Sequence, residues 1–75
     1  MGEDEKRLLY RLLQQWIDHP DDDVVLITEL LQKTGSVPLI IARRSDWAYS
    51  VPGEKGYRIT AKGIRALAAE KAAQS

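Results

Sequence analysis

The 75-residue chain contains no cysteine and no phenylalanine. Without cysteine it forms neither a disulfide nor a thiolate metal site, which fits a reducing compartment. Without phenylalanine, the interior is left to leucine, isoleucine, valine, two tryptophans and three tyrosines. No apolar run exceeds four residues, so we expect no membrane span and no signal-peptide core. A chain of this length is one domain. We expect the protein to be cytoplasmic. We expect the single domain to cover residues 1–75, with residues 1–4 and 73–75 frayed.

Motifs that carry catalysis or hold metals are also missing. The chain has no G-x-S-x-G motif, no G-x-x-x-x-G-K phosphate loop and no Cys/His pair. Its single histidine, His19, stands beside the acidic turn 21–23. That segment lacks a second histidine and the glycine and terminal glutamate of an EF-hand loop. We therefore expect no enzyme activity, no cofactor and no metal.

Net charge is zero, but the charges are unevenly distributed. Residues 1–42 contain four basic and eight acidic side chains, whereas residues 43–75 contain seven basic and three acidic ones. Such an asymmetry indicates an anionic partner for the basic half. An alternative of equal weight explains the asymmetry without a partner: acidic and basic faces serve only to keep a small protein in solution.

The first quarter of the chain has the pattern of an amphipathic helix, because its apolar residues recur at three- and four-residue spacing. These are Leu8, Leu9, Leu12, Leu13, Trp16 and Ile17. Asp4 is the expected N-cap. The helix should end before Pro20, because the residue preceding proline avoids helical backbone angles. Trp16 and the other aromatic residues are expected to pack in the core.

The next segment contains one ambiguous run and one clear turn. Val24–Ile27 fits either a short buried strand or the first turn of a helix capped by Asp23. The glycine at Gly35 suits a helix end that adopts left-handed backbone angles. Ser36 is then the expected cap of a third helix with Pro38 in its first turn. In this helix residues 39–42, including Ile40, should be mostly buried, and Arg43, Arg44 and Ser45 should face outward. A strand is the alternative for the isoleucine-rich run that follows, but Ser-x-Pro is typical of a helix start.

Residues 47–59 have the two-residue periodicity of a β-hairpin. The side chains expected to face the core are Trp47, Tyr49, Val51, Tyr57 and Ile59. The connection is the five-residue turn 52–56, in which Gly53 and Gly56 are both free to adopt positive φ.

A final helix is predicted from residue 61 to 73, capped by Thr60. Its expected inner stripe is formed by Ile64, Leu67, Ala68 and Lys71. Gly63 costs a helix about 1 kcal/mol relative to alanine, so we expect it to mark a close approach of another backbone segment.

Two segments carry a family resemblance. TELLQKTGS (28–36), followed by an apolar run, resembles the helix-turn-helix pattern of winged-helix proteins. YRITAKGIRAL (57–67) resembles their second wing strand and final helix, where a Tyr-x-Leu/Ile-Thr-x-x-Gly-x-x-x-Leu pattern is frequent. The chain departs from the family at Leu31, where crossing helices usually have a small residue, and at Pro38, where many members have a residue that can contact DNA. The resemblance implies an α+β fold: a small winged helix-turn-helix with a three-helix core, a β-hairpin wing and a C-terminal helix.

The same resemblance implies binding of duplex DNA, by a transcriptional regulator or a DNA-accessory factor. The candidate DNA-binding residues are Ser36, Arg43, Arg44, Ser45, Lys55, Arg58 and Lys62. Because the arginines come late in the third helix and its start is poor in base-reading groups, we expect mainly phosphate contacts. The alternative is a winged-helix protein-interaction or dimerisation module without nucleic-acid binding. It would contact a partner, or a second copy, through the first or the last helix.

Overall fold

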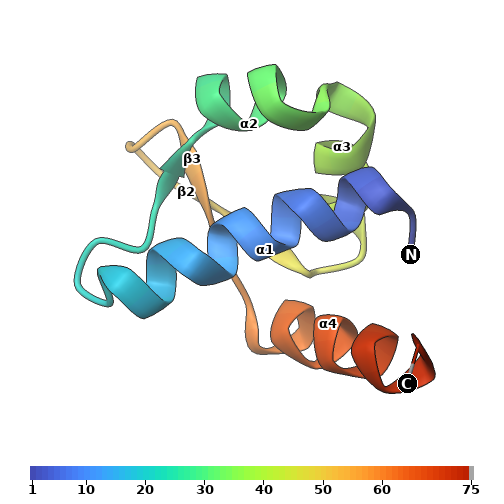
Figure 1. Cartoon of the computed structure of the whole chain (residues 1–75). Helices are drawn as coiled ribbons and strands as arrows, with labels where there is room; N and C mark the ends of the chain where they lie inside the picture. The colour runs from blue at the N-terminus through green and yellow to red at the C-terminus, as the bar shows by residue number, and fades with distance from the viewer. Residues whose placement is uncertain (75) are drawn as a thin grey trace.

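The computed structural model describes residues 1–74 and contains, within that range, four helices and a small antiparallel sheet (Figure 1). In chain order the elements are α1 (Glu3–Asp18), β1 (Val25–Leu26), α2 (Ile27–Thr34), α3 (Ser36–Arg44), β2 (Ala48–Val51), β3 (Gly56–Ile59) and α4 (Ala61–Gln74). The strand order is β1-β3-β2, and both neighbouring pairs are antiparallel. The predicted α+β class is confirmed. No helix among these residues is long and apolar enough to cross a membrane.

Helix α1 is the centre of the molecule. It contacts α2, α3, α4 and β3, and in Figure 1 it lies between the α2–α3 pair and α4. Its residues Leu8, Leu9 and Leu12 are completely buried, as is Leu30 of α2. Burying one such side chain stabilises a fold by about 1.5–3 kcal/mol, so these four leucines account for much of the core.

The N-terminal end of α1 differs from the prediction. The helix begins at Glu3 with Gly2 at its N-cap, so Asp4 lies in the first turn instead of capping it. The backbone N–H of Gly2 donates to the Glu5 carboxylate at 3.2 Å. Three acidic side chains in this turn stabilise it, because they lie near the positive end of the helix dipole.

Fraying was expected at both ends of the chain, in residues 1–4 and 73–75, and stays a prediction. The Met1 ammonium group pairs with the Glu70 carboxylate at 2.8 Å, which connects the start of the chain to α4. At the other end α4 continues through Gln74. The remainder of the prediction for 73–75 concerns Ser75, which lies outside the described residues.

The last turns of α1 contain exposed apolar side chains, so the prediction that the aromatic residues pack in the core is wrong here. Trp16 is 43% exposed and Ile17 is also exposed; Tyr10, nearer the middle of the helix, is exposed as well. Figure 1 shows the cause: the C-terminal end of α1 extends past both α4 and the α2–α3 pair. The apolar stripe continues further along this helix than the layers that cover it.

The ambiguous run Val24–Ile27 is divided between a strand and a helix. β1 pairs with β3 in the register Val25↔Tyr57 and Leu26↔Gly56, and α2 begins immediately afterwards at Ile27. Asp23 is therefore not a helix cap; Leu26 occupies the N-cap position of α2.

A single residue, Gly35, connects α2 to α3, and its φ of 81° is in the left-handed region as predicted. Its N–H donates to the carbonyl of Leu31 at 2.9 Å. The predicted third helix is confirmed, but Ser36 is its first helical residue and Gly35 its N-cap. Leu31, the large residue at a position where a small one was expected, is exposed.

The hairpin was predicted correctly, but β2 has the opposite phase. Ala48 pairs with Ile59 and Ser50 with Tyr57, and residues directly opposite each other share one face of a sheet. Tyr49 consequently faces away from the core and is 51% exposed. The buried Tyr57 and Ile59 of β3 fill the interior, so β2 contributes only the small Ala48.

The hairpin turn also differs from the prediction in one glycine. Gly53 has a positive φ of 83°, but the second positive φ, 51°, belongs to Lys55. Gly56 is instead the first residue of β3 and is buried. A side chain at Gly56 would collide with the Val24 side chain and with the carbonyl oxygen of Val25.

The junction between the hairpin and α4 follows the prediction. The Thr60 hydroxyl accepts a hydrogen bond from the N–H of Gly63 at 3.0 Å and donates one to the carbonyl of Asp46. Gly63 lies against the backbone of Trp47, where no Cβ fits. Of the predicted inner stripe of α4, Leu67 is buried and Ile64 half-buried, while Ala68 and Lys71 are exposed.

Candidate nucleic-acid interface

Helix α3 has one buried and one exposed face. Pro38, Leu39 and Ala42 are buried against the core. The exposed residues are Ser36, Val37, Ile40, Arg43 and Arg44. Residues three, four and seven positions apart share one side of a helix, so the exposed residues form one continuous surface, which we call the α3 outer face.

The α3 outer face contains two aliphatic residues that the sequence reasoning missed. Val37 is 64% exposed and Ile40 49%, although we expected Ile40 to be mostly buried. The helical periodicity of the segment contained the signal, because burial of Leu39 and Ala42 turns residues 37 and 40 outward.

Arg43 and Arg44 lie together at the C-terminal end of α3, where with Ile40 they line a surface hollow of about 460 Å³. Within residues 1–74, no carboxylate forms an ion pair with either guanidinium. Both positive charges stabilise α3 through its dipole and are available to an anionic ligand. Ser45, another candidate, is the C-cap of α3; its backbone N–H donates to the carbonyl of Ile41, and the residue is half-buried.

The other candidate residues do not join this group. Lys55 is exposed in the hairpin turn, where its carbonyl accepts a hydrogen bond from the N–H of Ile27 at 3.0 Å. Arg58 on β3 is partly neutralised, because its guanidinium lies 3.7 Å from the Asp23 carboxylate. Lys62 is exposed in the first turn of α4. The candidates therefore occupy separate places on the surface.

The hairpin determines the separation of two of these places. β2 begins three residues after α3 ends and leads to the turn that contains Lys55. Four strand residues span about 13 Å, so Lys55 lies at the opposite end of the strand from Arg44. Figure 1 shows the same arrangement, with the turn on the left and α3 on the right.

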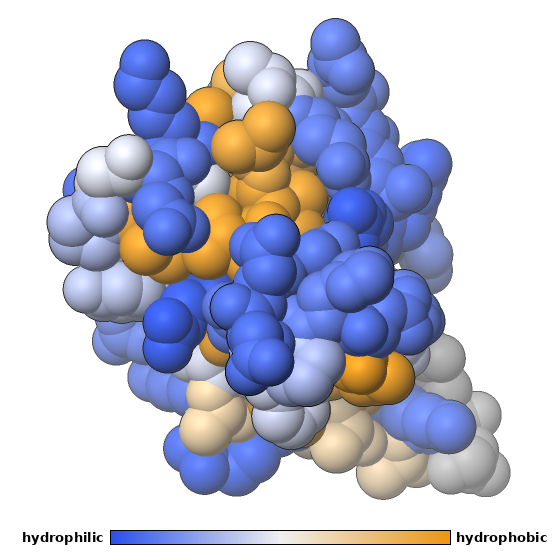
Figure 2. Space-filling model, turned by 90° about the vertical axis from the view of Figure 1, so that its left-hand side faces the viewer, coloured by the Kyte–Doolittle hydropathy of each residue, from blue (hydrophilic) through white to orange (hydrophobic). Residues whose placement is uncertain are grey.

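The side of the molecule that contains the hairpin turn is not uniformly charged. Figure 2 views this side and shows a hydrophobic area surrounded by hydrophilic side chains. Leu26, which pairs with Gly56 next to the turn, is one of the exposed apolar residues of the chain.

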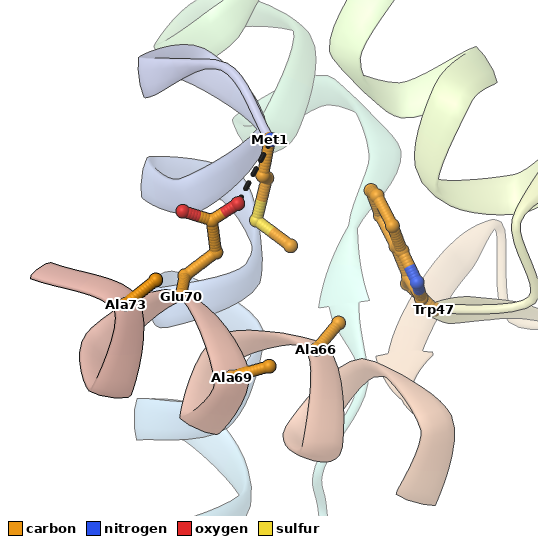
Figure 3. A pocket seen from close by; sticks show the side chains of 6 residues that line it. All are labelled: Met1, Trp47, Ala66, Ala69, Glu70 and Ala73. Atoms are coloured by element: carbon orange, nitrogen blue, oxygen red, sulfur yellow. Dashed lines mark ion pairs between the residues drawn. The ribbon is translucent and has the colours of Figure 1, made fainter.

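Two further hollows lie on the α4 side. One, of about 480 Å³, is a groove between α1 and α4, lined by Tyr10, Leu13, Ile64, Leu67, Ala68 and Lys71. The other is smaller, about 270 Å³, and is lined by Met1, Trp47, Ala66, Ala69, Glu70 and Ala73. In Figure 3 the Glu70 carboxylate reaches the backbone nitrogen of Met1 across this hollow.

Two ionisable groups, one in α1 and one in α4, have pKa values shifted from their usual ones. The hydrogen bond from the Met1 ammonium group lowers the pKa of Glu70 below its usual value. The hydrogen bond to Glu3 raises the pKa of Lys6. Within residues 1–74, no three His, Asp or Glu side chains are grouped closely enough to hold a metal ion.

Comparisons with protein-family models, with curated proteins and with solved structures find no match to this chain.

Proposed function

We propose that the chain is a winged helix-turn-helix domain that binds duplex DNA mainly through phosphate contacts, as a transcriptional regulator or DNA-accessory factor. The element order supports this: helix, strand, two helices joined by a tight turn, then a hairpin whose second strand is central in the sheet. In this proposal α3 is the recognition helix and the β2–β3 hairpin is the wing.

One observation carries the proposal: Arg43 and Arg44 are exposed on the α3 outer face, and neither is paired with a carboxylate within residues 1–74. Four other cations, Lys6, Arg7, Arg11 and Arg58, have acidic partners. Of the basic side chains without an ion pair within residues 1–74, only Arg43 and Arg44 are adjacent in the sequence; the others are Lys33, Lys55, Lys62, Arg65 and Lys71. Guanidinium groups bind phosphate oxygens in a two-pronged geometry, so an unpaired pair at the end of an exposed helix suits a DNA backbone.

The separation between the arginines and the wing also suits a duplex. The molecule measures 38 × 25 × 18 Å, and one turn of DNA is about 34 Å long. A recognition helix in the major groove leaves the backbone about half a turn away within reach of the hairpin turn. Lys55 would contact the phosphates there, independently of the arginines.

The test is fluorescence anisotropy of a labelled duplex of about two helical turns, titrated with the protein at several salt concentrations. Each phosphate contact contributes about −0.9 to the slope of log affinity against log salt. Arg43→Ala combined with Arg44→Ala should therefore make the slope about 1.8 units less steep and weaken binding to every sequence.

A charge-matched control is available on α4. Arg65→Ala combined with Lys71→Ala removes the same net charge on the far side of α1 from α3 (Figure 1), and should leave the slope near that of the wild type. Equal losses in the two double variants would mean that the α3 arginines form no specific contact. Absence of any shift at about 50 mM salt, where phosphate-driven binding is strong, would refute DNA binding itself.

A second function, that of a dimerisation module without nucleic-acid binding, is favoured by the groove between α1 and α4. Its lining, which includes the exposed Tyr10, is mostly apolar, and Ile17, seven residues further along α1, extends the apolar surface. Exposed apolar surfaces of this kind commonly mark protein contacts, and here the occupant would be a second copy of the chain. A dimer in sedimentation velocity, together with no DNA binding, would support this function over the first.

A further inference from the structure

The α3 outer face is apolar at the end that a recognition helix directs toward base edges. Val37 and Ile40 lie one helical turn apart, and Arg44 follows one turn beyond Ile40. Recognition helices contact base edges through their N-terminal residues. Val37, the most exposed of the large hydrophobic residues on the chain within residues 1–74, stands at that position.

Two exposed aliphatic side chains are unfavourable in water, and contact with another apolar group removes this unfavourable free energy of hydration. In the major groove of B-DNA, the apolar group on a natural base pair is the C5-methyl group of thymine. Phosphates flank that groove on both sides, which suits the arginines beyond Ile40. An apolar protein surface would match the aliphatic residues, but it would offer no negative charge to the two neighbouring unpaired arginines.

We propose that Val37 and Ile40 read thymine methyl groups, so that this domain prefers duplexes with thymine in the major groove under α3. This inference depends on the proposed function, and it adds a source of base preference to a surface with few hydrogen-bonding groups. Arg43 and Arg44 supply affinity without sequence information, while the two aliphatic side chains supply the preference.

The experiment compares a duplex of alternating A·T pairs with the same duplex containing uracil in place of thymine. The two have the same phosphates and the same base-edge hydrogen-bonding groups but differ in the methyl group. Burial of one methyl group changes affinity by a factor of about four. We expect the thymine duplex to bind about four- to fifteen-fold more tightly, according to whether one or both side chains make the contact.

A second comparison adds the methyl group instead of removing it. A G·C duplex with 5-methylcytosine carries the methyl group at the equivalent position in the major groove, and should bind more tightly than the unmethylated G·C duplex. Agreement between the two comparisons would separate a methyl contact from an effect of A·T shape.

The variant is Val37→Ala combined with Ile40→Ala, both at exposed helical positions where alanine is a strong helix former. It should bring the thymine-to-uracil affinity ratio close to one while the salt slope stays that of the wild type. Leu26→Ala, which truncates an exposed leucine on β1, is the matched control and should keep the full ratio. Circular dichroism checks that each variant is folded.

The outcomes are distinguishable from failure of the proposed function. Salt-dependent binding with equal affinity for thymine and uracil duplexes would overturn the methyl-reading proposal and leave DNA binding intact. A ratio unchanged in the Val37/Ile40 variant, or one equally reduced in the Leu26 control, would also overturn it. Absence of binding to any duplex would refute both proposals. A second copy bound through the α3 outer face would overturn the methyl-reading proposal, because that face would then have another occupant.

Discussion

Replacement of Gly63 by alanine should destabilise the protein, although helix propensity alone predicts the opposite. Gly63 is the third residue of α4, and alanine at a helical position is favoured over glycine by about 1 kcal/mol. The new Cβ, however, would lie in contact with the Trp47 carbonyl oxygen, 3.0 Å from Cγ1 of Ile59 and 3.1 Å from the Trp47 carbonyl carbon. Real Cβ atoms do not come so close to a carbonyl oxygen, so either α4 or the strand must move.

The Trp47 carbonyl has little freedom to yield. It accepts a hydrogen bond from the N–H of Thr60 at 3.1 Å, and the N–H of Trp47 donates to the carbonyl of Ala42 at 2.9 Å. Overpacking of a well-packed site costs about 1–3 kcal/mol, and loss of the Thr60 hydrogen bond adds about 1 kcal/mol. After subtraction of the propensity gain, the free energy of unfolding should fall by about 2 kcal/mol. For a domain of this size the melting temperature should fall by about 8–16 °C.

Urea unfolding followed by tryptophan fluorescence measures this change, since Trp47 lies at the contact. Ala68→Gly, at an exposed position of the same helix, is the control for propensity and should cost about 1 kcal/mol. If Gly63→Ala raised the midpoint, or left it unchanged, the close approach of α4 to the Trp47 backbone would be refuted.

Two other changes test neighbouring features. Thr60→Ala removes the hydroxyl that caps α4 and should reduce the free energy of unfolding by about 1 kcal/mol. Thr60→Ser keeps a hydroxyl and should retain most of the wild-type stability. Equal urea midpoints for the two variants would contradict the capping role. Glu70→Gln tests the pair with the Met1 ammonium group. The pKa of Glu70 is lowered in the folded protein, so its carboxylate stabilises the fold above the usual glutamate pKa of about 4.3, and this stabilisation is lost as the pH falls through the lowered value. The wild type should therefore have the higher urea midpoint at neutral pH, and the difference should vanish in acid. A difference that grew in acid would contradict the assignment.

Local chemistry made much of the fold predictable. The cap at Thr60, the close approach at Gly63 and the positive φ at Gly35 all follow from what one residue type can do at one position. The leucine spacing in α1 likewise predicted the buried face, because helical periodicity depends only on neighbours three and four residues away.

The predictions are wrong where contacts between segments far apart in the sequence determine the structure. The phase of β2 depends on its register with β3, and the larger Tyr57 and Ile59 leave room only for Ala48. β1 is two residues long, and its partner Tyr57 is 32 residues further along the chain. A strand this short has no periodicity of its own, so only the pairing identifies it. Trp16 is exposed because, within residues 1–74, no other helix covers the C-terminal end of α1.

In the candidate site, too, the local features were predictable and those that depend on distant contacts were not. Exposure of Arg43 and Arg44 follows from the amphipathic pattern of α3 and was predicted. Neutralisation of Arg58 by Asp23 was not, because the pair depends on the pairing of β1 with β3. The exposure of Ile40 was accessible from the periodicity, but its apolar character favoured a buried assignment.

The one-residue connection between α2 and α3 has a consequence for how this molecule can adapt. With only Gly35 between them, and with its N–H bonded to the carbonyl of Leu31, the two helices can change their relative orientation only through the backbone angles of this one residue. Any residue with a Cβ at this position would be strained at a φ of 81°. The four-residue turn 52–55 between β2 and β3 is the longer connection and is exposed throughout, so we expect insertions and sequence variation to be tolerated there more readily than at Gly35.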